Sequence, residues 1–176
     1  QLCYDTYLLK YDGKEVTLTE KGCEKEATVN LAIGKKTYKN TVKDDIETEF
    51  NISDDISDMT NIVCNNGATI SMNDNTLKLS DAFDDTTCSM SNSINATFAK
   101  LDNTKNYILM LKDENVSETL IIKENKNVTF DLNGKNITAL PGCQYTLRNF
   151  GKLTINDSTG TGVMKTTRWL LANRLE

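Results

Sequence analysis

Asn127-Val-Thr-Phe-Asp-Leu-Asn-Gly134 is the stretch that decides the fold of this chain. Polar and apolar residues alternate along it and then meet an Asn-Gly pair, the pattern of a short strand closed by a tight turn. The alternation restarts at 135–138 and again at 151–155, and residues 157–162 (Asp-Ser-Thr-Gly-Thr-Gly) form the next corner. The region 115–173 is therefore predicted to be a series of short strands separated by glycine corners.

One of these segments returns along the chain. Tyr145-Thr-Leu-Arg-Asn149 matches Trp169-Leu-Leu-Ala-Asn173 at a spacing of 24 residues. Short strands that repeat at such a period are typical of a solenoid, in which each coil stacks on the one before it.

Two strings in this region resemble a known family. Residues 128–138 (Val-Thr-Phe-Asp-Leu-Asn-Gly-Lys-Asn-Ile-Thr) and 149–162 (Asn-Phe-Gly-Lys-Leu-Thr-Ile-Asn-Asp-Ser-Thr-Gly-Thr-Gly) are similar to coils of the right-handed parallel β-helix, a pectate-lyase-like fold. The likeness is to secreted surface and adhesin-like proteins of low-GC Gram-positive bacteria, and it covers roughly residues 93–176. Residues 62–69, 77–80 and 86–88 resemble a small β module of the same proteins. The resemblance implies an extracellular, modular and non-enzymatic protein.

The first half of the chain alternates in the manner of antiparallel strands. Segments 7–11 and 15–19 flank Asp12-Gly13, and segments 27–33 and 36–39 flank Gly34-Lys35, so two hairpins are predicted. Residues 47–52 are expected to add a strand. Residues 1–90 then form a small antiparallel β region, either one sandwich-like domain or two modules split near 50–58. Residues 91–176 form the second domain.

Residues 93–101 are predicted to be a helix that precedes the first buried strand, at 107–111. Ile94, Phe98 and Leu101 share one face, and Ser93 is a suitable N-cap. A solenoid needs a cover at each end, and this helix supplies one. Nothing similar follows the last coil, so we expect further coils, a partner or a second copy beyond Glu176. The candidate assembly edge consists of Trp169, Leu170, Leu171 and Asn173.

The five cysteines indicate an oxidising compartment. Spacings of 20 and 24 residues favour the pairs Cys3–Cys23 and Cys64–Cys88, each of which would stabilise the fold by about 3 kcal/mol. Cys143 is either a buried free thiol or a partner for a group outside this chain. The alternative is five buried thiols in a cytosolic protein.

Several classes of function and segment are disfavoured by composition. The chain has no histidine, which excludes Ser-His-Asp triads, Cys-His dyads and histidine-bearing metal sites. Its net charge of −5 and lack of a basic run disfavour nucleic-acid binding. No signal peptide and no apolar run long enough to span a membrane is present. Gln1 as first residue indicates that a leader was removed or that the chain is a fragment.

Catalytic and metal-binding alternatives remain weaker. In an enzyme of this fold an acid–base cleft would draw on Asp131, Arg148, Lys152, Asp157 and Arg168. However, both aspartates stand at expected turns, where Asp bonds nearby backbone amides. The acidic groups 44–45, 54–58 and 81–85 match no EF-hand loop. Solvated loops are the preferred interpretation, with calcium retained as an alternative and no other cofactor expected. Six Asn-x-Ser/Thr sequons are expected to stay bare, and they begin at Asn51, Asn95, Asn115, Asn127, Asn136 and Asn156.

These observations together predict a mainly β, non-enzymatic extracellular surface, adhesin-like or structural protein. Its partners would be other copies of itself or a glycan or protein of a host or cell surface. Two alternatives stay open. One is a filament subunit that stacks end to end, and the other is a carbohydrate-binding or polysaccharide-lyase-like domain, which fold analogy alone supports.

Overall fold

The computed structural model describes residues 6–11, 14–19, 26–33, 36–43, 47–80, 86–166 and 168–173. Within these residues the fold is mainly β, with several sheets and one short helix. The elements in chain order are β1 (Thr6–Tyr11), β2 (Lys14–Thr19), β3 (Glu26–Ile33), β4 (Lys36–Lys43), β5 (Thr48–Asn51), β6 (Asn61–Cys64), β7 (Thr69–Asn73), β8 (Thr76–Ser80), β9 (Thr87–Ser91), α1 (Ile94–Ala99), β10 (Lys105–Met110), β11 (Glu114–Val116), β12 (Leu120–Ile122), β13 (Asn127–Asp131), β14 (Asn136–Ala139), β15 (Tyr145–Asn149), β16 (Lys152–Asn156), β17 (Val163–Lys165) and β18 (Trp169–Asn173).

The first half of the chain forms antiparallel pairs where alternation predicts them. β1 pairs with β2, β3 pairs with β4, and β8 lies between β5 and β7. The strands of both predicted hairpins are confirmed, although their turn residues lie outside the described part of the chain. The β7–β8 turn places Asp74 at a φ of 49°, a left-handed conformation that Asp tolerates better than most residues.

The second half of the chain builds three parallel sheets, each with one strand from each of three successive repeats. We define the first repeat as β10–β12, the second as β13–β15 and the third as β16–β18. Residues paired between neighbouring repeats lie 22 to 27 positions apart in sequence. Tyr145 pairs with Trp169 and Asn149 with Asn173, so the predicted 24-residue match is confirmed as a structural register.

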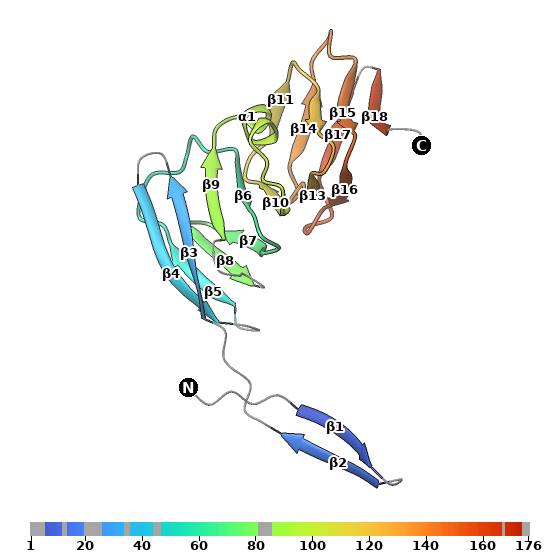
Figure 1. The fold of residues 1–176 in the computed structure, drawn as a ribbon. Coiled ribbons are helices and arrows are strands. Elements are labelled where there is room, and N and C mark those ends of the chain that lie inside the picture. Colours follow the sequence, from blue (N-terminus) through green and yellow to red (C-terminus); the bar gives the residue numbers. More distant parts are fainter. Residues whose placement is uncertain are drawn as a thin grey trace.

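A single seven-stranded sheet joins the two halves, in the order β16-β13-β10-β6-β9-β3-β4 (Figure 1). β10 is the central link, because it pairs in parallel with β13 and antiparallel with β6. The sheet thus runs across the predicted domain boundary between residues 90 and 91.

The two faces of β10 contribute to different hydrophobic cores. Leu109 packs into the core beneath β5–β9, which includes Phe50, Ile62 and Leu77. Ile108 and Met110 point to the opposite face and pack with the repeats. This period of two residues is the pleat of a strand, and here it couples both cores through one strand.

Helix α1 begins where the sequence predicts and ends two residues earlier. The Ser93 hydroxyl accepts a hydrogen bond from the Ala96 amide at 3.2 Å, which confirms the N-cap. Ile94 and Phe98 are buried among the residues of the repeats. Phe98 meets Phe130 edge to face, with ring centroids 5.4 Å apart. The helix therefore packs its apolar face on the first two repeats.

Candidate functional site

The third repeat leaves apolar side chains open at the C-terminal edge of all three parallel sheets. Ile155 pairs with Phe130 of the second repeat, and Leu171 pairs with Leu147. Phe130 and Leu147 are fully buried, whereas Ile155 is 43% exposed and Leu171 is 40% exposed. The residues at these positions point the same way, so the difference arises because no strand stacks on β16, β17 or β18 in the described structure.

We call this surface the open edge. It contains all four residues of the predicted edge and adds Ile155 and Val163, which lie on other strands. Trp169 is 61% exposed and Leu170 is 42% exposed, while Ile155 on β16 and Val163 on β17 extend the surface across the remaining sheets. Asn173 also lies on this edge, and its side-chain oxygen accepts a hydrogen bond from the Asn149 side-chain amide at 3.3 Å. The strand register would have identified Ile155, since it follows Phe130 by one repeat.

The opposite edge of the repeats is covered. β6 pairs with the free side of β10, and α1 lies against β11 and β12. Polar groups also stabilise this contact. The Ile94 backbone amide donates to the Glu114 carboxylate at 2.9 Å, and the Asn95 side-chain amide donates to the Glu118 carbonyl at 3.1 Å. Covering an edge with a helix or a further strand prevents another chain from pairing with it.

The two aspartates considered for catalysis both serve corners between repeats. Asp131 is buried and accepts hydrogen bonds from the Tyr107 hydroxyl at 2.6 Å, the Asn133 amide at 2.9 Å and the Ser158 amide at 3.0 Å. Burial raises the pKa of Tyr107 to about 12, with the hydrogen bond to Asp131 as the next cause. This carboxylate therefore links groups from three repeats.

Asp157 occupies the corner of the third repeat. Its carboxylate accepts from the Gly134 amide at 2.8 Å and from the Gly162 amide at 2.6 Å. Burial opposes ionisation, but these amide hydrogen bonds and one from the Thr159 hydroxyl hold its pKa below the ordinary carboxyl value. Gly134 has a φ of +74°, and an added Cβ would collide with the Thr159 hydroxyl, so only glycine fits this corner.

The basic residues considered with these aspartates lie elsewhere. Arg148 is on β15, in a different sheet, with its guanidinium 5.0 Å from the centre of the Phe150 ring. Lys152 is exposed at the start of β16, and Arg168 is exposed before β18. The structure does not gather the five residues into one cleft: the carboxylates face backbone amides, and Arg148 faces an aromatic ring.

A cleft of about 410 Å³ lies where the antiparallel half meets the corners of the repeats. We call it the junction cleft. Its lining combines apolar side chains with both signs of charge, and consists of Asp55, Ile56, Ser57, Met59, Met72, Asp74, Asn75, Leu111, Lys112, Asn133 and Lys135. Its volume falls within the range of small-ligand sites. Sequence reasoning missed it, because its walls come from four segments that are distant in the chain.

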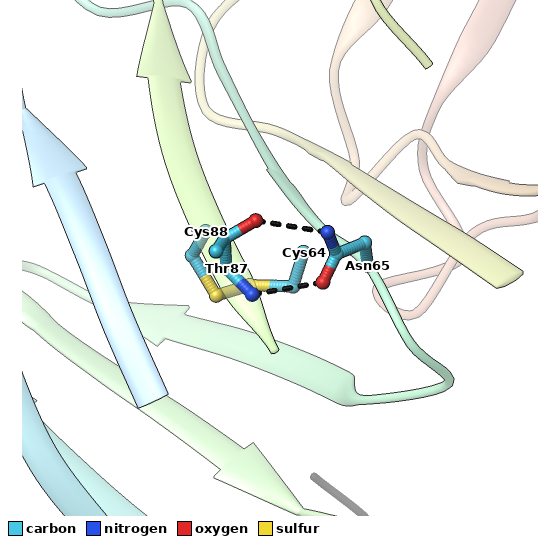
Figure 2. Close-up of a disulfide and its surroundings, with 4 residues drawn as sticks. All are labelled: Cys64, Asn65, Thr87 and Cys88. Atoms are coloured by element: carbon cyan, nitrogen blue, oxygen red, sulfur yellow. Dashed lines mark hydrogen bonds between the residues drawn. A yellow bond between two sulfur atoms is a disulfide. The ribbon is translucent and has the colours of Figure 1, made fainter. Parts of the chain in front are cut away.

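One disulfide confirms a predicted cysteine pair. Cys64 and Cys88 face each other on β6 and β9 and are bonded, with their Cα atoms 4.1 Å apart (Figure 2). Beside them the Asn65 side chain donates to the Thr87 hydroxyl and accepts from the Thr87 amide, both at 2.8 Å. The predicted Cys3–Cys23 pair lies outside the described residues.

Cys143 is a buried free thiol among the residues of the repeats. Its sulfur donates to the Tyr145 carbonyl at 3.0 Å. The described structure therefore agrees with the first of the two alternatives, a buried free thiol.

Two further groups of findings concern metals and membranes. In the described part of the chain, no three His, Cys, Asp or Glu residues are grouped as metal ligands would be. Of the three acidic groups considered for calcium, residues 54–58 form a loop in which the Ser57 amide donates to Asp55 at 2.9 Å. The other two, Asp44 with Asp45 and residues 81–85, lie outside the described residues. Over the same described ranges, no helix has the length and apolarity needed to cross a membrane.

Compared with known protein families, curated proteins and solved structures, the chain gives no significant match.

Proposed function

We propose that this chain is a non-enzymatic extracellular surface protein, adhesin-like or structural, that presents a right-handed parallel β-helix with an open edge as its contact surface. Three parallel sheets that each receive one strand per repeat support the β-helix assignment. The resemblance of residues 93–176 to coils of Gram-positive surface proteins points in the same direction.

The observation that carries the proposal is the exposure of the open edge. Ile155 and Leu171 are 43% and 40% exposed at positions whose counterparts one repeat earlier are fully buried. Beside them run three edge strands whose outer backbone N–H and C=O groups have no strand partner in the described structure. Such an edge binds another polypeptide by adding a strand, with main-chain hydrogen bonds for affinity and apolar contacts for specificity.

The extracellular assignment draws support from the disulfide between Cys64 and Cys88. Disulfides persist in oxidising compartments and are rare where glutathione keeps thiols reduced. The carboxylates of Asp131 and Asp157 serve the corners of the repeats, which accords with a structural rather than a catalytic role.

To test the proposal, the full chain is displayed on the surface of a cell that otherwise does not aggregate or adhere. We expect cells carrying the chain to adhere to one another or to host-cell monolayers, and the variant Ile155→Lys to lose this adhesion. Ile121→Lys is the matched control, because Ile121 is also 43% exposed but lies in the first repeat. Adhesion that is absent in the parent chain, or equal in all three, would reject the proposal.

The junction cleft favours a second candidate function, carbohydrate binding. Its polar lining includes amides and lysines that can bond sugar hydroxyl and carboxylate groups, and Met59, Met72 and Leu111 supply an apolar floor. A glycan array probed with the full chain tests this candidate. Signals that vanish in Lys112→Ala but persist in Lys165→Ala, a lysine outside the cleft, would support it.

A further inference from the structure

We propose that the junction cleft binds a sugar that carries both a carboxylate and an N-acyl group. This inference rests on the second candidate function, carbohydrate binding in the junction cleft, and it names the class of sugar. The volume of about 410 Å³ lies near the lower end of the range for small-ligand sites, which suits one or two sugar units.

The junction cleft is preformed, because backbone hydrogen bonds hold its walls together. The Leu111 and Lys112 amides both donate to the Thr60 carbonyl, at 2.8 and 3.3 Å. The Ile52 amide donates to the Asn75 carbonyl at 2.8 Å. A ligand that enters walls already held in place does not spend binding free energy on ordering them.

Asn133 forms the wall on the side of the repeats. Its side-chain amide donates to the Met110 carbonyl at 3.0 Å, and its side-chain oxygen accepts from the Ser158 hydroxyl at 3.3 Å. Both polar atoms of this side chain therefore have partners within the chain. Asn133 shapes the cleft, and the choice of ligand depends on the apolar floor and the charged groups.

The apolar floor fits a small alkyl group. It consists of Ile56, Met59, Met72 and Leu111, which are partly buried and pack against the core beneath β5–β9. The lining residues that the structure describes include no aromatic side chain on which a sugar ring could stack. Methionine side chains adapt to irregular apolar groups. The methyl group of an N-acyl substituent gives a sugar an apolar group of this kind.

One of the two lysines in the lining is available for an anion. Lys112 lies near Asp55: hydrogen bonds from the Ser57 hydroxyl and amide hold the pKa of Asp55 below its usual value, and the Lys112 charge adds to this. Lys135 is half-buried and forms no ion pair within the described residues. A partly desolvated ammonium group without a counter-ion attracts a carboxylate strongly.

Asp74 supplies an acceptor for sugar hydroxyl groups. It lies in the turn between β7 and β8 with a φ of 49°, and its carboxylate accepts no hydrogen bond over the described ranges. An ionised carboxylate only accepts hydrogen bonds, and sugar hydroxyls donate them. Its negative charge also disfavours ligands with several anionic groups. The cleft thus provides separate contacts for a methyl, a single carboxylate and hydroxyls.

Saturation-transfer NMR of the full chain with free sugars tests the ligand class. N-acetylneuraminic acid and N-acetylmuramic acid carry both groups, whereas N-acetylglucosamine lacks the carboxylate and glucuronic acid lacks the acyl group. We expect at least one of the two N-acylated acids to bind about tenfold more tightly than either control sugar. Its acyl methyl protons should receive the strongest saturation. The acid that binds identifies the source, either the ends of cell-surface glycans or bacterial cell wall.

Substitutions at Lys135 test the carboxylate contact. Lys135→Met should raise the Kd of the N-acylated acid by about tenfold, because a charge-assisted hydrogen bond is lost, and should leave the Kd of N-acetylglucosamine unchanged. Lys135→Arg keeps the charge and should restore binding. Lys165→Met is the control, because this lysine lies on β17 outside the cleft. Circular dichroism checks that each variant keeps the parent fold.

Substitution of Met72 tests the apolar floor. Met72→Gln places an amide where the acyl methyl would lie, so the N-acylated acid should bind more weakly while glucuronic acid is unaffected. Met164→Gln is the matched control, because Met164 is also partly buried but packs against the core of the repeats. Equal losses in the two methionine variants, or in Lys135→Met and Lys165→Met, would overturn the inference.

The remaining outcomes separate this inference from the candidate function on which it rests. Binding of neutral sugars alone, lost in Lys112→Ala, would overturn the inference and keep carbohydrate binding as a function of the cleft. An N-acylated acid that binds equally well to the parent chain, Lys135→Met and Met72→Gln would place the sugar elsewhere and also overturn it. The absence of binding by all four sugars and by a glycan array would reject both.

Discussion

The buried carboxylate of Asp131 joins three successive repeats through the Tyr107 hydroxyl and the amides of Asn133 and Ser158. A buried carboxylate is tolerated only when hydrogen bonds replace its lost hydration. The arrangement explains why the sequence holds Asp at the start of the Asp-Leu-Asn-Gly corner. Its Asn133 bond is the local turn expected there, whereas the other two bonds come from distant parts of the chain.

Replacing Tyr107 with Phe removes one donor from this buried carboxylate. We expect the free energy of unfolding to fall by about 1–3 kcal/mol, because one carboxylate oxygen loses its partner. Urea denaturation at neutral pH measures this change. The control is Tyr145→Phe, since the Tyr145 hydroxyl has no hydrogen-bond partner among the described residues. Equal destabilisation by both variants would contradict the assigned role.

The same tyrosine predicts a loss of stability at alkaline pH. Its pKa is about 12 in the folded chain against 10.0 for an ordinary tyrosine. The unfolded chain therefore loses this proton first, and the contribution of Tyr107 to stability is complete below pH 10.0 and is lost as pH rises towards about 12. Stability measured across this window should decline less in Tyr107→Phe than in the parent chain.

Asp157 predicts the opposite behaviour at acidic pH. Because its folded pKa lies below the ordinary value of 3.8, its contribution is complete above that pH and is lost as pH falls through the folded pKa. We expect Asp157→Asn to be less stable than the parent chain at neutral pH, since Asn has one acceptor oxygen and its NH2 group cannot accept from the second glycine amide. The difference should shrink in acid, and a difference independent of pH would contradict this account.

Helix α1 is short, so its caps and its packing determine whether it forms. Six residues are too few for a stable isolated helix. The Ser93 cap and the burial of Ile94 and Phe98 supply what propensity lacks. The cap could be predicted because it depends on residues three apart, whereas the fit against Phe130 depends on the fold of the repeats.

Two substitutions at Ser93 separate the cap from other effects. Ser93→Ala should lower the free energy of unfolding by about 1 kcal/mol, and Ser93→Gly by only a few tenths, because glycine leaves the first amides accessible to water. Hydrogen exchange of the Ala96 amide should accelerate in the alanine variant. Equal effects of the two substitutions would show that the hydroxyl is not acting as a cap.

Continuity of the seven-stranded sheet makes the two halves of the molecule mechanically interdependent. Leu109 on β10 is 1% exposed and belongs to the core beneath β5–β9, while its neighbours Ile108 and Met110 belong to the core of the repeats. A change on one face of this strand therefore reaches both cores. Pairing of β6 with β10 joins segments more than forty residues apart, from Asn61–Cys64 to Tyr107–Met110.

Leu109→Ala tests this coupling. We expect a loss of about 2–5 kcal/mol in the free energy of unfolding, which is typical of a fully buried leucine. Hydrogen-exchange protection should fall in β6 and in β13 together. Leu140→Ala is the control, since Leu140 is 38% exposed. Loss of protection confined to β6 would show that the halves open independently.

Local sequence patterns predicted the strands of the two hairpins, several strands of the repeats, the helix cap and the 24-residue register, because alternation and capping residues act over a few positions. They did not predict the short strands β11, β12 and β17. The Cys64–Cys88 pair could also be predicted, since its spacing suits two neighbouring strands. Only the tertiary structure decided that β6 joins β10, that four distant segments enclose the junction cleft, and that β6 and α1 cover the first repeat. Those features depend on which edges and side chains meet after the chain has folded, and pairings between distant segments leave no periodic signal in the sequence.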